Sequence, residues 1–193
     1  MAKPPNYILC IETANTVTSV AISKDGVCVI LKEIQEPNKA ADALHLLIEA
    51  ALNETALTFA NLHAVAISAG PGSYTGLRIA AAAAKGYCFA LNIPLIAIPT
   101  LQAMVHGIIE RYQQNDFDIY VPMIDARRME VFTSFYDNKL NCTNYFTSLI
   151  VDTQCNQLFD NSKKYILFGN GAEKTKAILS STKIIKRSLD LES

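Results

Sequence analysis

The stretch Ser68-Ala69-Gly70-Pro71-Gly72-Ser73-Tyr74-Thr75-Gly76-Leu77-Arg78 joins two segments of different character. Before it lies an apolar run over 62–67, typical of a buried strand, and the alanine-rich sequence after it predicts a helix over 79–91. Gly70 and Gly72 permit backbone angles that residues with a Cβ resist, and Ser73 is a suitable N-cap. Two interpretations remain open: a loop that offers free amides to an anion, or a tight packing corner.

The pattern of elements around this corner predicts a mixed sheet. Apolar runs indicate strands at 7–11, 18–23 and 27–34, and the Asp25-Gly26 pair predicts a hairpin turn between the last two. An amphipathic helix is expected at 40–53, and after the glycine corner a strand at 92–98 and a helix at 100–112. Three antiparallel strands followed by strand–helix crossovers, which are right-handed, therefore form a first lobe over residues 1–112.

The remaining sequence repeats the same order of elements. Strands are expected at 119–124, 129–136, 145–151 and 164–168, with helices at 152–159 and 172–179. The polar segment 113–116 separates them from the first half. We therefore expect an α/β chain with a second lobe over 113–193, which the order of elements suggests is truncated before a closing helix.

Composition excludes several classes of protein. The chain has 193 residues, half of them hydrophobic, and 17 basic against 18 acidic side chains, so no overall field attracts it to nucleic acid or membrane. The segment 163–187 is locally basic, which fits a solvated face or an RNA contact. Five cysteines without a Cys-x-x-Cys pair indicate a reduced, cytoplasmic protein, and neither a signal peptide nor a transmembrane segment is expected.

No complete site for cofactor, metal or nucleophile is recognisable. Thr75 stands where a P-loop beginning at Gly70 needs its second glycine, and no lysine follows. The histidines His45, His63 and His106 are isolated rather than at metal-ligand spacing. We therefore predict no catalytic residue, cofactor or metal.

The segment Glu12-Thr13-Ala14-Asn15-Thr16 lies between the first two expected strands. Proteins similar to actin, hexokinase and acetate kinase carry their first phosphate loop at this place, usually with a glycine where this chain has Ala14. Because alanine lacks the open backbone of glycine, we interpret the segment as a vestigial nucleotide loop.

Four motifs together resemble the TsaB (YeaZ) family: 8–14 (ILCIETA), 70–79 (GPGSYTGLRI), 99–101 (PTL) and 124–131 (IDARRMEV). The resemblance implies an actin-like (RNase H-like) two-lobed fold and a role in making threonylcarbamoyladenosine beside the tRNA anticodon. It also implies a non-catalytic subunit that pairs with the TsaD transferase, is joined by the TsaE ATPase, and forms a homodimer when alone. Direct contact with tRNA stays open.

The resemblance further implies that the helices of the first lobe form the partner interface. The expected interface residues are Leu44, Leu47, Ala51, Tyr74, Leu77, Arg78 and Ala81. Family members often have His-Ser where this chain has Ala40-Ala41.

Two alternatives belong to other classes of protein. A nucleotide-dependent enzyme of the actin and sugar-kinase class would use Glu12 for Mg²⁺ and Thr13 and Thr16 for phosphate. A peptidase would need a nucleophile–base pair, and none is visible.

Overall fold

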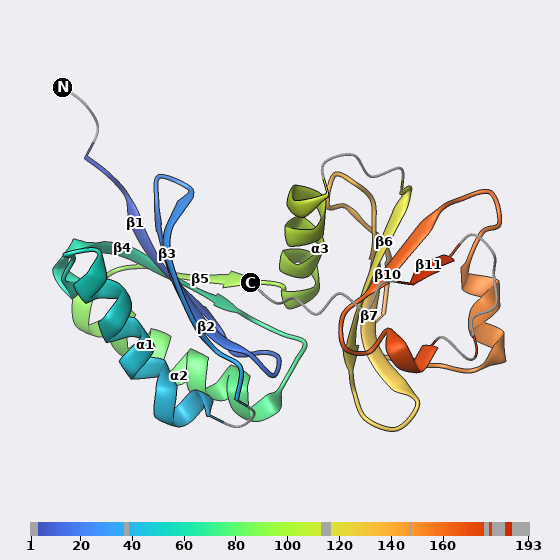
Figure 1. The fold of residues 1–193 in the computed structure, drawn as a ribbon, viewed down its shortest axis with the longest axis horizontal. Coiled ribbons are helices and arrows are strands. Elements are labelled where there is room, and N and C mark those ends of the chain that lie inside the picture. Colours follow the sequence, from blue (N-terminus) through green and yellow to red (C-terminus); the bar gives the residue numbers. More distant parts are fainter. Residues whose placement is uncertain are drawn as a thin grey trace. The chain divides into compact units, whose positions relative to one another are not determined.

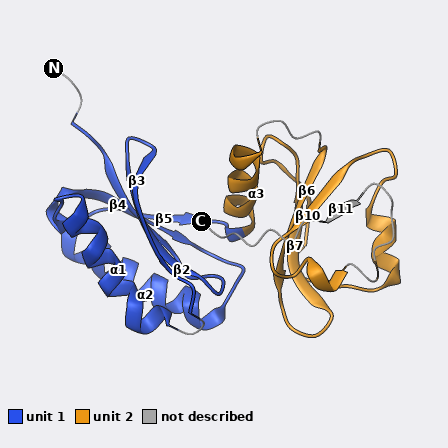
Figure 2. Cartoon of the chain, in the orientation of Figure 1, with its two compact units in different colours: residues 1–100 blue, residues 101–193 orange. Residues whose placement is uncertain are grey.

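The computed structural model describes residues 4–36, 39–112, 117–146, 148–175, 178 and 184–186, the last three by their backbone. The chain divides into two compact units, residues 1–100 and 101–193 (Figure 2). Among the helices of the described residues, none combines the length and the apolar character needed to cross a bilayer.

The first unit is a five-stranded sheet with α1 and α2 on one face (Figure 1). The strand order is β3-β2-β1-β4-β5; the pairs β1–β2 and β2–β3 are antiparallel, while β1–β4 and β4–β5 are parallel. The elements are β1 (Tyr7–Glu12), β2 (Thr18–Lys24), β3 (Val27–Ile34), α1 (Ala40–Glu54), a 3₁₀ turn η1 (Phe59–Asn61), β4 (Leu62–Ser68), α2 (Tyr74–Leu91) and β5 (Leu95–Ile98).

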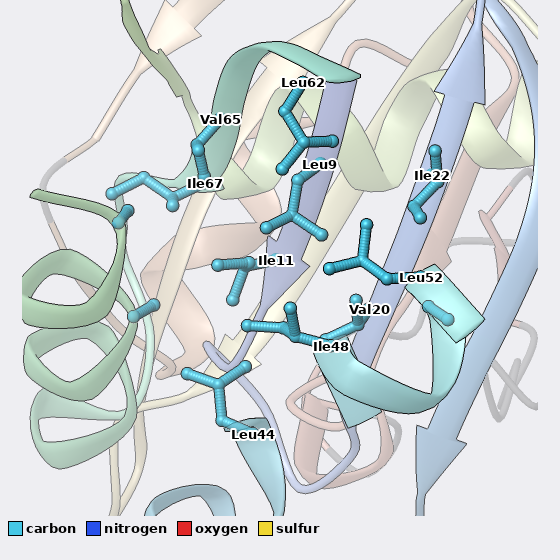
Figure 3. Close-up of a cluster of buried hydrophobic side chains, with 13 residues drawn as sticks. Leu9, Ile11, Val20, Ile22, Leu44, Ile48, Leu52, Leu62, Val65 and Ile67 are labelled. Carbon is cyan, nitrogen blue, oxygen red and sulfur yellow. The ribbon is translucent and has the colours of Figure 1, made fainter. Parts of the chain in front are cut away.

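The core of this unit follows from two periodicities. Alternate apolar residues of β1 and β2 face the helices and are buried, namely Leu9, Ile11, Val20 and Ile22. In α1, Leu44 and Ile48 recur at helical spacing and meet those strands (Figure 3). The sheet and both helices are therefore held by one apolar cluster.

The second unit repeats this topology. Five strands of its six-stranded sheet have the order β11-β10-β6-β7-β8, with β6–β7 and β7–β8 antiparallel and β6–β10 and β10–β11 parallel. The sixth strand, β9, pairs with β7 in the antiparallel direction. The expected architecture, three antiparallel strands followed by parallel ones in each lobe, is confirmed. The elements are α3 (Thr100–Arg111), β6 (Ile119–Asp125), β7 (Glu130–Tyr136), β8 (Cys142–Tyr145), β9 (Leu149–Ile150), the 3₁₀ turns η2 (Thr153–Leu158) and η3 (Glu173–Thr175), β10 (Tyr165–Phe168) and β11 (Ile184–Lys186).

The second unit also differs from expectation in detail. The strand expected over 145–151 is divided, because β8 pairs with the end of β7 and β9 pairs with its start. The helix expected over 152–159 is the 3₁₀ turn η2. Of the helix expected over 172–179, η3 covers Glu173–Thr175, and residues 176, 177 and 179 lie outside the described part.

Along the chain, the first unit ends at residue 100, whereas the sequence predicts the boundary after residue 112. The reason is the packing of α3. Its apolar side chains, among them Val105 and Ile108, are buried against Tyr120 and Phe168 of the second sheet. Residues 101–111 therefore belong to the second core.

Candidate protein-interaction site

The glycine corner is packed against the connection between β1 and β2. A Cβ on Gly76 would lie under 3.0 Å from the carbonyl oxygen of Thr13, and one on Gly72 would lie 2.5 Å from that of Ala14. Backbone atoms cannot yield as a flexible side chain does, so both positions require glycine. Gly70 has a φ of +105°, a left-handed conformation that favours glycine.

Hydrogen bonds at the corner join the same two segments. The Thr13 hydroxyl donates to the Gly76 carbonyl (2.8 Å), and the Ser73 amide donates to the Ala14 carbonyl (2.7 Å). The Ser73 hydroxyl accepts from the Gly76 amide (3.2 Å), which confirms Ser73 as the N-cap of α2. Because the Ser73 and Gly76 amides are already bonded, the geometry favours the packing interpretation over an anion cradle.

Two of the three residues considered for nucleotide binding, Glu12 and Thr13, are also engaged within the chain. Glu12 accepts hydrogen bonds from the Ala14 amide (2.5 Å) and from the Ser68 hydroxyl. Thr13 is buried, whereas Thr16 is exposed. In the part of the chain that the structure describes, no group of three or more His, Cys, Asp or Glu side chains could hold a metal ion.

A calorimetric titration with Mg-ATP is expected to show a dissociation constant weaker than about 1 mM. Binding there would have to break the Glu12 hydrogen bonds and displace the Thr13–Ala14 backbone from the glycine corner. The Thr16→Ala variant serves as a control and should behave like the wild type. Micromolar binding that this variant weakens would restore the nucleotide-dependent alternative.

The outer side of α2 is unusually apolar for an exposed surface. Of its 18 residues only Gly76, Ala80 and Ala84 are buried, and only Arg78 and Lys85 are charged. The exposed residues include two aromatic side chains, Tyr74 at 74% and Phe89 at 91% exposure. Such an apolar surface is typical of a site that contacts another protein.

Small residues recur along this side of α2. Ala82, Gly86 and Ala90 are four residues apart, so they lie on one side of the helix, and all three are exposed. A Cβ on Gly86 would meet nothing within 4 Å. The backbone of another helix could therefore approach α2 closely here.

Helix α1 adds further exposed residues and is tied to α2. The Nδ1 atom of His45 and the hydroxyl oxygen of Tyr87 are hydrogen-bonded at 2.7 Å. The Tyr87 ring stacks on the Phe59 ring, with 5.0 Å between the two ring centroids. Burial raises the pKa of Tyr87, so the phenol stays protonated. Leu46 of α1 is 66% exposed. The outer helical face, as we use the term, consists of Ala41, His45, Leu46, Tyr74, Arg78, Ala82, Gly86, Phe89 and Ala90.

The seven expected interface residues fall into three groups. Leu44 and Ala51 are fully buried in the unit's own core, so their side chains are not available to a partner. Leu47, Leu77 and Ala81 are half-buried. Tyr74 and Arg78 are exposed and contact each other, because the Arg78 guanidinium donates to the Tyr74 hydroxyl (3.0 Å).

The expected residues do not include Leu46, Phe89 or the stripe of small residues, all of which are exposed. They follow apolar helical spacing, which marks the stripe facing the sheet. The four-residue spacing of Ala82, Gly86 and Ala90, on the opposite side of α2 from Ala80 and Ala84, was the available signal.

Comparisons with known proteins identify relatives of this chain. The sequence model of TsaD, tRNA N6-adenosine threonylcarbamoyltransferase, matches residues 37–178. The "tRNA threonylcarbamoyladenosine biosynthesis protein TsaB" of Buchnera aphidicola subsp. Acyrthosiphon pisum is 31% identical over 164 residues, which is 82% of this chain and 72% of that protein. The Escherichia coli protein of the same name is 30% identical over 69% of this chain but 56% of its own length.

Solved structures agree with the fold. YeaZ from Pseudomonas aeruginosa superimposes with a TM-score of 0.75 and 22% identity, over 95% of this chain and 85% of that one. A second Pseudomonas aeruginosa structure, described as an uncharacterized protein with similarity to peptidase YEAZ, gives a TM-score of 0.77 at the same identity and coverage. The two-lobed fold expected from the sequence is confirmed.

Proposed function

This chain belongs to the TsaB (YeaZ) family, and we propose that it is a non-catalytic subunit that pairs with a TsaD-type transferase to place threonylcarbamoyl groups on tRNA adenosine. The observation that carries the proposal is the apolar outer helical face in a unit whose vestigial nucleotide loop is packed against the glycine corner. A protein of this family that offers a binding surface but no open phosphate loop is suited to assembly rather than to chemistry.

The outer helical face is the proposed contact with the transferase. Three features support it: the 91% exposure of Phe89, the four-residue spacing of Ala82, Gly86 and Ala90, and the scarcity of charge on α2. The match of this chain to the TsaD sequence model suggests a partner of similar architecture, with a comparable pair of helices to meet α1 and α2. A stable contact of this kind buries at least about 1,000 Å².

Further partners follow from the same proposal. When the transferase is absent, the outer helical face can pair with that of a second copy and form a homodimer. A TsaE-type ATPase would join the pair of chain and transferase. We place the complex in the cytoplasm, in keeping with five free cysteines.

Size-exclusion chromatography of the chain mixed with the TsaD-type transferase of its own organism tests the proposal. We expect the two proteins to elute together at a 1:1 ratio, at a volume distinct from that of either alone. Separate elution at micromolar concentration would contradict it.

A further inference from the structure

The turn between β6 and β7 has an unusual backbone. Arg127 has a φ of 69° and Arg128 a φ of 45°, so two consecutive residues with long side chains adopt the left-handed conformation. This conformation is costly for residues other than glycine, asparagine and aspartate. If only folding mattered, glycine, asparagine or aspartate would be favoured at these two positions. The two arginines are therefore better explained by a function of their side chains.

A lysine from η3 holds this turn in place. Lys174 Nζ donates to Asp125 Oδ1 (2.5 Å), to the Arg128 carbonyl (3.0 Å) and, less closely, to the Arg127 carbonyl (3.4 Å). The Lys174 hydrogen bond lowers the pKa of Asp125, which is therefore ionised at neutral pH. Asn170 accepts from the Asp125 amide (2.8 Å). The ammonium group is thus used to shape the turn, and it also neutralises the carboxylate beside it.

The two arginine side chains are left without partners. Both are exposed, and within the described residues neither guanidinium makes a hydrogen bond or an ion pair. The other two arginines of the described chain are engaged: Arg78 with Tyr74, and Arg111 with a partner of its own. The turn therefore presents two adjacent, uncompensated positive charges on a rigid support.

We propose that the Arg127-Arg128 turn binds the phosphate backbone of RNA. The guanidinium group offers a planar fork of donors that matches two phosphate oxygens at once. Because the whole chain has a net charge of −1, an RNA contact must come from a local cluster of this kind rather than from an overall field. The identification of RNA rests on the proposed function, in which the substrate of the complex is tRNA.

Two exposed apolar side chains flank the turn and fit the same ligand. Met129 is 42% exposed, and Ile150 of the paired strand β9 is 66% exposed. The Val151 amide donates to the Met129 carbonyl (2.7 Å), which keeps β9 beside the turn. A ribose or an unstacked base can pack on these side chains while the adjoining phosphates meet the arginines.

The test replaces both arginines by asparagine, which loses the two charges but tolerates the left-handed backbone. Binding of an unmodified tRNA transcript is measured by fluorescence anisotropy at three salt concentrations, for the chain alone and for its mixture with the transferase. For Arg127→Asn/Arg128→Asn we expect about tenfold weaker tRNA binding. The slope of the logarithm of the affinity against the logarithm of the salt concentration should become shallower by about 1 for each phosphate contact that is lost. The melting temperature should be unchanged or higher.

The matched control is Lys24→Asn/Lys139→Asn, which removes two positive charges from exposed positions outside this turn and outside the basic segment 163–187. It should bind tRNA like the wild type. Unchanged tRNA affinity in the arginine variant, equal losses in both variants, or no binding by the wild type would overturn the proposal. If the arginine variant kept its tRNA affinity but no longer eluted together with the transferase, the turn would bind a protein rather than RNA. Co-elution is read separately, so a failure of the proposed pairing leaves the tRNA result for the chain alone intact.

Discussion

Gly76→Ala is expected to lower the free energy of unfolding of the first unit by about 3 kcal/mol or more. The added methyl group would lie under 3.0 Å from the Thr13 carbonyl oxygen, and α2 could admit it only by moving away from the β1–β2 connection. That movement would also break the hydrogen bond from the Thr13 hydroxyl to the Gly76 carbonyl. Urea denaturation followed by circular dichroism measures the change.

The same helix supplies the matched control. Gly86 also lies inside α2, but a Cβ there meets nothing within 4 Å. Gly86→Ala should therefore raise stability by roughly 0.5–1 kcal/mol, since alanine favours the helix more than glycine does. If Gly76→Ala were as stable as the wild type, the packing interpretation of the glycine corner would be wrong.

Phe89→Glu is expected to weaken binding to the transferase at least 100-fold, which corresponds to about 2.7 kcal/mol. The substitution places a charge within the proposed contact, where it would lose its water. The Phe89 side chain is 91% exposed in the isolated chain, so the melting temperature should stay unchanged. Isothermal titration calorimetry with the transferase measures the effect.

Val27→Glu is the control for this substitution. Val27 is also an exposed apolar residue of the first unit, at 66%, but it lies on β3 rather than on a helix. It should leave the affinity for the transferase within about twofold of the wild type. Equal losses in both variants would show that the outer helical face is not the contact.

The glycine corner illustrates how far sequence alone reaches. The strand, the turn and the Ser73 cap follow from local preferences and were predicted. The choice between an anion cradle and a packing corner depends on Thr13 and Ala14, about 60 residues away in the sequence. No local pattern reveals that approach, so the sequence left both interpretations open.

The interface residues show a second limit of a different kind. Helical spacing identified Leu44 and Ala51 as apolar positions of α1, and both lie in the unit's own core. An apolar stripe facing a sheet and one facing a partner have the same period. Only the position of the sheet distinguishes them, and it leaves Leu46 and Phe89 exposed.

The Arg127-Arg128 turn shows a third limit. Its sequence was recognised as part of a family motif, but the left-handed backbone at two arginines was not expected. That conformation depends on Lys174, which lies more than 40 residues further along the chain. Turn preferences, which favour glycine and asparagine, would have predicted a different backbone.

The central claim, that this chain assists a transferase without catalysing the reaction itself, is tested most directly by reconstituting the modification. Threonylcarbamoyladenosine formed in a tRNA transcript is measured with the purified transferase, the ATPase and the activated threonylcarbamoyl donor, with and without this chain. We predict product only when the chain is present, and little product with Phe89→Glu. Full activity without the chain, or product formed by the chain in the absence of the transferase, would contradict the account.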